Sequence, residues 1–241
     1  MFHSNVKYAT STEYTLDLKN NLPDVLSIII IHKDKPEFLN ICLQSIVATS
    51  SNNNYEIIVV DNNSGSESQQ FLDELDSDIK IIRSDKNIYW SAAANLGMKA
   101  ADPRSKYVLF LHADVVVLNP AWLDLLMNIC ETNNAGMVGV ESGMVNILNQ
   151  NVNFIQEWCV LFSKLALEKI GDWPEELPLI GNAFIMTLKA QLKGYKPQVI
   201  QNNVVHHYRV FGVDVSEYER IESESKRMIP QVYMKIAPKV V

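Results

Sequence analysis

Two aspartates stand directly after short apolar runs in this 241-residue chain. Asp114 follows the run from Tyr107 to Leu111, and Asp61 follows the run from Glu56 to Val60. Such runs are typical of buried strands, and the carboxyl ends of strands are where α/β sheets bind ligands. Asp114 is therefore a candidate ligand for Mg²⁺ or Mn²⁺, and Asp61 a candidate acceptor of hydrogen bonds from a base or a ribose. The alternatives are that Asp114 caps a turn and Asp61 caps a helix.

Strands and helices that must position these residues alternate along the first half of the chain. Apolar runs predict strands at 26–31, 56–60, 80–82 and 107–111. Helical spacing predicts a helix that begins at Pro36, one that contains Phe71, Leu72 and Leu75, one at 91–101, and one that opens at Pro120. This alternation predicts an α/β fold: a doubly wound, mostly parallel sheet with helices on both faces.

The second half is less regular. Short strands are expected near 144–148, 152–158, 199–201 and 204–207, and helices near 163–170 and 183–193. Gly194 is a plausible stop for the second helix. Ser216 and Glu219 fit a capping box for a terminal helix.

Composition excludes several classes of protein. The chain is 47% hydrophobic and 20% charged, which is globular, and it lacks the ~18 uninterrupted apolar residues of a membrane span. No secretory signal is recognised, so a cytoplasmic location is expected. The net charge of -7 argues against a nucleic-acid partner. Three dispersed cysteines suggest neither a disulfide framework nor a zinc knuckle, and each is expected in the core.

Four segments in a fixed order carry a family resemblance. They are LSIIIIHKDKPEFLNICLQSI, EIIVVDNNSGS, NIYWSAAANLGMKAA and YVLFLHADVVVLNPAWL. From Leu26 to about Tyr208 the chain resembles the family 2 glycosyltransferases, which have the GT-A fold. The resemblance implies an N-terminal arm (1–25) and a single domain (26–241). That domain comprises a nucleotide-binding half (about 26–140), an acceptor-side half (about 141–210) and a C-terminal helical tail (about 211–241).

The resemblance also implies which residues lie near a nucleotide-diphosphate sugar. They are Ile31, His32, Lys33, Asp61, Asn63, Asn87, Trp90, Asn95, His112 and Ala113. Tyr89 replaces the glycine that is usual between Asn87 and Asn95. His32 and Lys33 can equally belong to a solvated loop, and Asn95 can form hydrogen bonds within its own helix.

A metal site is implied by the same comparison. His112-Ala113-Asp114 replaces the D-x-D-like triplet of the family, with Asp114 on its metal-contacting position. His206 or His207 resembles the histidine that closes the domain and reaches the metal or the diphosphate. Neighbours in a strand face opposite sides, so only one of the two can enter the site, and His207 is favoured. A histidine in the motif suits Mn²⁺ better than Mg²⁺.

The expected chemistry is inverting transfer of a sugar, in which a carboxylate takes the proton of the acceptor hydroxyl. The acidic E-D signature of the family is replaced by Gly181-Asn182-Ala183, and Asn182 cannot act as a base. Glu157, Asp172, Glu175 and Glu176 are the substitutes within reach, and the alternative for each is a solvated surface position. Trp158 and Trp173 fall in the acceptor region and suit either sugar stacking or the core.

The sequence therefore indicates a metal-dependent glycosyltransferase of glycan or surface-polysaccharide synthesis. Its expected partners are a nucleotide-sugar donor, a glycan or lipid-linked acceptor, and a second copy of the chain in a homodimer. The rival hypothesis is a catalytically weak homologue that binds a nucleotide sugar and acts as a regulatory subunit. A nucleotidyltransferase would need a glycine-rich phosphate loop after the first strand, and HKDKPEF is not one.

Overall fold

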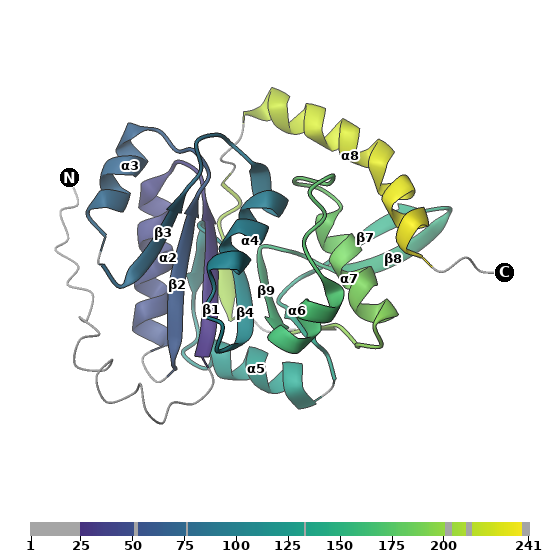
Figure 1. The fold of residues 1–241 in the computed structure, drawn as a ribbon, viewed down its shortest axis with the longest axis horizontal. Helices are drawn as coiled ribbons and strands as arrows, with labels where there is room; N and C mark the ends of the chain where they lie inside the picture. Colours follow the sequence, from purple (N-terminus) through teal and green to yellow (C-terminus); the bar gives the residue numbers. More distant parts are fainter. Residues whose placement is uncertain are drawn as a thin grey trace.

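The computed structural model describes residues 25–50, 53–75, 77–132, 134–200, 204–210 and 214–237. These residues form a seven-stranded central sheet (Figure 1). Its order is β10 (Gln198–Val199), β6 (Met137–Gly139), β9 (Cys159–Ser163), β4 (Ser105–His112), β1 (Val25–His32), β2 (Tyr55–Asp61) and β3 (Ile79–Arg83). β9 is antiparallel to both of its neighbours, and the other pairs are parallel. The predicted α/β fold with a mostly parallel sheet is confirmed.

Helices cover both faces of this sheet. They are α2 (Pro36–Thr49), α3 (Ser66–Asp73), α4 (Tyr89–Ala100), α5 (Trp122–Thr132), α6 (Lys164–Ile170) and α7 (Asn182–Leu192). Successive residues of a strand face opposite sides, and β1 shows this directly. Ile28 and Ile30 pack in the core beneath α2, α3 and α5, whereas Ile29 packs beneath α4, α6 and α7. All three isoleucines are fully buried.

The predicted elements of the first half agree with the structure to within a few residues. The register pairs His32 with Asp61 and Ile31 with His112, so the carboxyl ends of β1, β2 and β4 lie side by side. The close approach of α4 to β1 depends on Gly97, where a Cβ atom would lie 2.4 Å from Cγ2 of Ile29.

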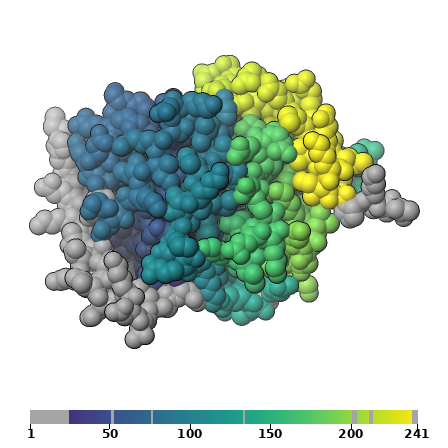
Figure 2. All heavy atoms as spheres, in the orientation of Figure 1, coloured from purple at the N-terminus to yellow at the C-terminus, as the bar shows by residue number. Residues whose placement is uncertain are grey.

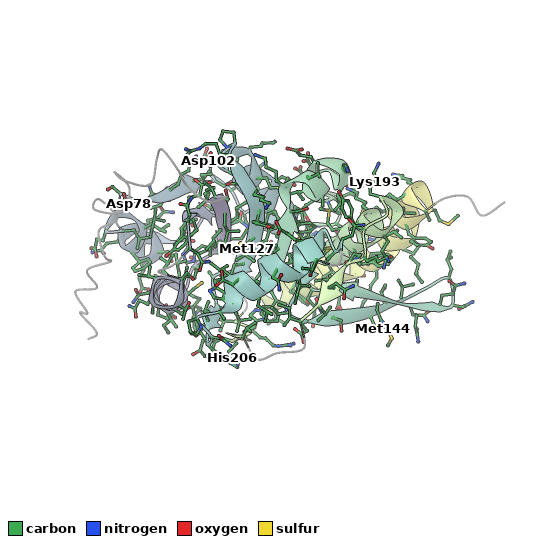
Figure 3. All side chains as sticks on the ribbon, turned by 90° about the horizontal axis from the view of Figure 1, so that it is seen from below. Asp78, Asp102, Met127, Met144, Lys193 and His206 are labelled. Carbon is green, nitrogen blue, oxygen red and sulfur yellow. The ribbon has the colours of Figure 1, made fainter. Side chains whose placement is uncertain are left out.

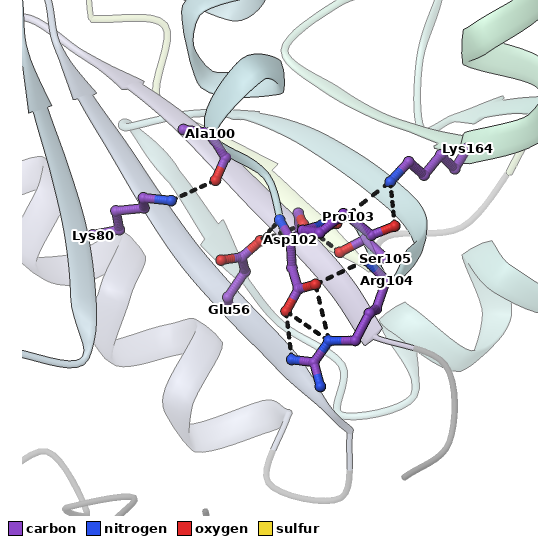
Figure 4. Close-up of polar contacts among 9 residues, drawn as sticks. Glu56, Lys80, Ala100, Asp102, Pro103, Arg104, Ser105 and Lys164 are labelled. Atoms are coloured by element: carbon purple, nitrogen blue, oxygen red, sulfur yellow. Dashed lines mark hydrogen bonds and ion pairs between the residues drawn. The ribbon is translucent and has the colours of Figure 1, made fainter. Parts of the chain in front are cut away.

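A polar network connects the amino-terminal ends of the parallel strands, opposite the carboxyl ends (Figure 4). The hydroxyl of Ser27 in β1 donates to Oε1 of Glu56 at 2.6 Å and lies 2.5 Å from the hydroxyl of Ser105. The same Glu56 oxygen accepts from the backbone N–H of Asp102 at 2.5 Å. Lys164 adds a hydrogen bond from Nζ to the carbonyl oxygen of Pro103. These hydrogen bonds fix the turn between α4 and β4 to the neighbouring strands and to α6.

The chain beyond β4 adds two small sheets and a long helix. β5 (Val115–Val117) pairs with β11 (Val205–His207), and β7 (Ser142–Ile147) pairs with β8 (Gln150–Ile155) as an antiparallel hairpin. Met144 marks this hairpin in Figure 3, and it is 65% exposed. The helix α8 (Val215–Ile236) runs above α7 and the hairpin and forms the upper rim of the molecular face in Figure 2. A third core joins these elements through Phe184, Ile229 and Val232.

Three details differ from the sequence prediction, and one predicted segment is not described. The strand expected at 152–158 ends at Ile155, and Cys159 begins the separate strand β9. Asp214 caps α8, because its carboxylate accepts from the backbone N–H of Ser216, so the capping box at Ser216 was wrong by two residues. The strand expected at 199–201 is described only as far as Ile200, and its paired residues are 198–199. The predicted arm lies outside the described residues, apart from Val25, which begins β1.

The three cysteines are buried and free, as expected. Gly194 follows α7 with a φ angle of +84°, the conformation expected of a glycine that ends a helix. None of the helices in the described part of the chain is both long enough and apolar enough to cross a membrane.

Candidate active site

A cavity of about 480 Å³ opens at the carboxyl ends of β1 and β4. Its volume lies within the range of small-molecule sites, roughly 300–1,000 Å³. The segments that line it come from the ends of both strands, from the start of α4, from the loop between β8 and β9, from the segment before α7, and from α8. The cavity therefore lies where a doubly wound sheet is expected to bind its ligand.

One wall of the cavity holds three side chains that we call the histidine–aspartate cluster: His112, Asp114 and His207. One ligand atom from each lies within 4.8 Å of the other two. Oδ1 of Asp114 is 3.2 Å from Nε2 of His207 and 3.8 Å from Nδ1 of His112. Oδ2 of Asp114 accepts a hydrogen bond of 2.7 Å from the backbone N–H of Val210, which leaves Oδ1 facing the two imidazoles.

Local structure brings this cluster together. His112 ends β4, and Asp114 follows two residues later in the turn to β5. β11 pairs with β5 so that His207 lies opposite Val115, beside Asp114. The N–H of Tyr208 donates to the carbonyl oxygen of Asp114, which fixes the two strands next to the cluster. His206 is exposed, as the alternation of side chains along a strand requires (Figure 3).

The electrostatics of the cluster favour a bound cation. Burial and the neighbouring His207 lower the pKa of His112 to about 3, so its imidazole is neutral at neutral pH. Burial raises the pKa of Asp114, but the hydrogen bond from His207, the electrostatic interaction with the two imidazoles and the N–H of Val210 outweigh this and bring the pKa below its ordinary value. Nε2 of His112 and Nδ1 of His207 have no hydrogen-bond partner among the described residues. A neutral imidazole and a carboxylate are the forms that ligate metals.

The donor set therefore fits a divalent cation of the first transition row. Two imidazoles and one carboxylate suit Mn²⁺ better than Mg²⁺, which prefers an all-oxygen shell. The three residues occupy one wall only, so the open side of the cavity would supply the remaining ligands from a bound molecule.

Glu141, which follows β6, organises the surroundings of the cluster. Its Oε2 accepts a hydrogen bond of 2.7 Å from Nε1 of Trp158, and Arg209 donates to both of its carboxylate oxygens at 2.9 and 3.2 Å. The ring of Trp158 stacks on His207, with ring centroids 4.7 Å apart and an interplanar angle of 21°. Arg209 precedes Val210, whose N–H holds Asp114. One carboxylate is thus linked to two members of the cluster.

The structure brings many of the residues selected from the sequence together around the cavity. These are Ile31, Lys33, Asn87, Trp90, His112, Ala113, Asp114, Glu157 and His207. Trp90 also contacts His112, with ring centroids 4.5 Å apart. Trp158 lines the cavity, whereas Trp173 is 1% exposed and packs in the core against Phe110 and Phe162.

The other selected residues do not line the cavity: His32, Asp61, Asn63, Asn95, Asp172, Asn182 and His206. Asp61 is fully buried, and its oxygens accept hydrogen bonds from the N–H of Ser64 and from Nε2 of Gln69. His32 is fully buried next to Ser68, 3.2 Å from its hydroxyl, and burial lowers the pKa of His32 to about 4. In this conformation, contact of Asp61 or His32 with a ligand would require neighbouring side chains to move.

Asn95 and Asn182 both have structural partners. The side chain of Asn95 accepts from the N–H of Trp173 and donates to its carbonyl oxygen, which fixes α4 to the segment before α7. Asn182 is fully buried, donates to the hydroxyl of Ser91 at 3.1 Å, and accepts from the N–H of Ala183. The start of α7 therefore offers no base to the cavity, and Asp172 is exposed on the surface.

Glu157 is a carboxylate on the cavity wall whose pKa is raised to near neutrality. It is half-buried in the loop between β8 and β9. Burial raises its pKa to about 7, and the charge of Glu141 adds to this, whereas its own backbone N–H and His207 act in the opposite direction. A group that titrates near neutrality is suited to proton transfer at that pH.

Sequence reasoning missed several lining residues. Glu141 follows a strand too short to be recognised, and Arg209 has a left-handed backbone with a φ angle of +59°. Tyr218 and Glu222 come from α8. Their helical spacing with the buried Ile221 and Ser225 is the one signal that could have placed them on the inner face of this helix.

Fold and site together define an α/β domain that presents a candidate metal cluster and a ligand cavity at the carboxyl ends of its parallel strands. The sequence model described as Glycosyl transferase family 2 matches residues 27–171. The chain belongs to this family.

Known relatives agree with this assignment. The chain is 23% identical over 220 residues to the O-antigen biosynthesis protein RfbC of Myxococcus xanthus, and the match covers 76% of this chain and 17% of that protein. The mannosyltransferase PcManGT of Pyrobaculum calidifontis, solved with GDP-Man and Mn²⁺, superposes with a TM-score of 0.63 at 15% identity, covering 87% of this chain and 63% of that one. TarS 1-349 of S. aureus, solved with UDP, superposes with a TM-score of 0.64 at 16% identity, covering 89% and 67%.

Proposed function

We propose that the chain transfers a sugar from a nucleotide-diphosphate donor to a hydroxyl of a glycan or lipid-linked acceptor, with inversion and with the help of a divalent metal. The observation that carries this proposal is the histidine–aspartate cluster on the wall of the cavity, in a chain that belongs to family 2. The complexes of PcManGT with GDP-Man and Mn²⁺ and of TarS with UDP support the same class of donor. The likeness to RfbC supports a role in polysaccharide synthesis.

The donor would lie across the carboxyl ends of β1 and β4. Asp114, His112 and His207 would hold the metal, preferably Mn²⁺, which when bound neutralises the charge of the departing diphosphate. Lys33 lines the cavity and supplies positive charge at the end of β1. Asn87 and the face of Trp90 lie on the same side and would orient the nucleotide.

Glu157 is the proposed base. Its carboxylate would accept the proton from the acceptor hydroxyl while that oxygen bonds to the anomeric carbon and the bond to the diphosphate breaks. The elevated pKa of Glu157 makes the deprotonated form a stronger base than an ordinary carboxylate. This assignment replaces the acidic pair that the family carries at positions 181–183 of this chain.

A screen of nucleotide diphosphates and their sugars, with and without Mn²⁺, tests the proposal. The probes are UDP, GDP, dTDP, UDP-glucose, UDP-GlcNAc and GDP-mannose. We expect at least one of them to raise the melting temperature only when Mn²⁺ is present, because a ligand that binds the folded state stabilises it. We also expect slow release of the nucleotide diphosphate from the matching sugar donor. If none of these probes binds, the proposal is wrong.

One observation favours a second candidate function. Asn182 occupies the register of the catalytic acid pair and is fully buried, so the usual base is absent. A homologue that binds a nucleotide sugar without turnover and acts on a partner protein would show this pattern. Metal-dependent binding without donor hydrolysis, and without transfer to any acceptor tested, would support this second candidate.

A further inference from the structure

The helix α8 contributes two polar side chains to the wall of the cavity. Tyr218 and Glu222 both line it, and their spacing of four residues places them on the same side of the helix. The same cavity is lined by the histidine–aspartate cluster and by Glu157. The helix therefore faces the same space as the reacting groups of the proposed function.

The position of α8 is held from two directions. Ile221, Ile229 and Val232 are each less than 10% exposed and pack against the body of the domain. The phenol of Tyr89, at the start of α4, donates a hydrogen bond of 2.5 Å to Oε1 of Glu217. The family match ends at residue 171, so α8 is a feature of this chain that lies beyond the matched segment.

The charged residues that line the cavity come from several elements. Among the described residues that line it, the cations are Lys33 and Lys35, which follow β1, and Arg209; Lys33 is paired with Asp34 and Arg209 with Glu141. Glu157 and Glu222 are lining carboxylates from the loop between β8 and β9 and from α8. Burial raises the pKa of Tyr218, and the carboxylates of Glu222 and Glu157 raise it further, which indicates that both lie near the phenol. Lys226 pairs with Glu222 at 3.0 Å but does not line the cavity.

We propose that Tyr218 and Glu222 of α8, together with Glu157, form the acceptor subsite, and that this subsite takes an uncharged sugar rather than one that carries a carboxylate or a phosphate. The inference rests on the proposed function and names the class of acceptor for the same site.

The chemistry of these groups matches a neutral sugar ring. Ionised carboxylates accept strong hydrogen bonds from hydroxyl groups, and an aromatic ring packs against the C–H face of a sugar. Phe154 and Trp158 add apolar surface to the wall of the cavity. An anionic acceptor would instead bring its charge next to Glu157 and Glu222, whereas the described lining cations come from the segment after β1 and from Arg209, which is paired with Glu141.

Saturation-transfer NMR on the full chain tests this assignment, with UDP and Mg²⁺ present and also absent. The probes are methyl α-D-mannoside and methyl β-D-glucoside, which are neutral, and methyl β-D-glucuronide and mannose 6-phosphate, which are anionic. We expect at least one neutral probe to bind and the anionic probes to bind about tenfold or more weakly, as one hydrogen bond to a charged group allows. Glu222→Gln should weaken the neutral probe about tenfold. Tyr218→Leu, which removes the aromatic ring, should also weaken it, and both variants should leave the affinity for UDP unchanged.

Glu219→Gln is the matched control, because Glu219 lies on the same helix but is exposed and does not line the cavity. The inference is wrong if no neutral probe binds, if the glucuronide binds as well as the glucoside, or if the variants bind the neutral probe like the wild type. It is also wrong if the variants lose affinity for UDP equally, because α8 would then belong to the donor site. A failure of UDP to bind would leave the test of the acceptor subsite intact, since the sugar probes are also measured without nucleotide; the proposed function is refuted separately, by the failure of every nucleotide probe in the Mn²⁺ screen.

Discussion

Replacing Asp114 by asparagine separates the charge of this side chain from its structural role. Its Oδ2 accepts from the N–H of Val210, and its Oδ1 faces Nε2 of His207 at 3.2 Å. An asparagine keeps one oxygen for Val210 and turns its NH₂ toward His207. Because Nδ1 of His207 is unpartnered, this imidazole can change its tautomer to accept that hydrogen bond. We therefore expect the variant to fold with little loss of stability.

The loss of the negative charge should remove the metal-dependent stabilisation. A ligand at 100 times its Kd stabilises the folded state by about 2.7 kcal/mol. For a chain of this size, each kcal/mol corresponds to about 2–4 °C in Tm, so Mn²⁺ with a bound nucleotide should raise the Tm of the wild type by roughly 5–11 °C. If the variant binds a hundredfold more weakly, the gain falls to about 0.4 kcal/mol, or roughly 1–2 °C.

Differential scanning fluorimetry with and without Mn²⁺ measures this difference. Asp114→Ala should also lose the partner of the Val210 N–H, so its Tm without ligand should fall by the equivalent of about 1–3 kcal/mol, unlike that of Asp114→Asn. Asp73→Asn, which removes an exposed carboxylate on α3, is the control for a change of net charge. If Asp114→Asn shows the full Mn²⁺-dependent shift of the wild type, the metal site has been assigned to the wrong residue.

Three further predictions follow from individual side chains. In the wild type kcat/KM should rise as the pH passes about 7, the pKa of Glu157. Glu157→Gln should abolish this rise and lower kcat by about 10²–10⁴-fold. An unaltered rate excludes Glu157 as the base. His32 has a pKa of about 4 in the folded chain against an ordinary 6.5, so the unfolded chain binds a proton first as the pH falls. Between pH 6.5 and pH 4 the free energy of unfolding, measured in urea, should therefore fall by about 3 kcal/mol more in the wild type than in His32→Gln. Equal losses in the two proteins would contradict the buried neutral state of His32. Gly97→Ala should lower the free energy of unfolding by about 1–3 kcal/mol, because the added Cβ would lie 2.4 Å from Cγ2 of Ile29. Lys99→Ala, on the exposed side of α4, is the control and should change stability little. A Gly97→Ala protein as stable as the wild type would refute the close packing of α4 on β1.

The parts of the fold that could be predicted are those whose pattern is local. The run LSIIII predicts β1 because it is buried on both faces, and Pro36 marks the start of α2. β5, β6 and the direction of β9 could not be predicted in this way. β5 and β6 have three residues each, too few for any periodicity, and β9 is antiparallel because of its partners β4 and β6 rather than its own residues.

The site was predictable to a similar degree. The position of Asp114 after a buried strand was sufficient to place it at the cavity. The sequence did not predict which face of the sheet the last side chains of a strand point to. Ile31 and His32, which are neighbours at the end of β1, therefore differ in whether they reach the cavity. Ile31 lines the cavity beside His112, whereas His32 points to the opposite face, toward Ser68 of α3. Glu141 reaches the cavity only through tertiary packing, which no local pattern records, whereas the helical spacing of Glu222 could place it on the inner face of α8 but not at the cavity.

The network around Glu141 suggests how this chain keeps a metal site with one carboxylate fewer than the D-x-D motif. Residues that orient ligands determine metal affinity almost as strongly as the ligands themselves. Here Glu141 holds Trp158 against His207, and through Arg209 it fixes the turn whose Val210 N–H orients Asp114. The substitution of His112 for an aspartate lowers the negative charge of the site, and a rigid outer shell offsets that loss by reducing the entropy lost on binding. If the site binds a cation, as proposed, we expect preorganisation by Glu141 rather than charge to be the property that makes this possible.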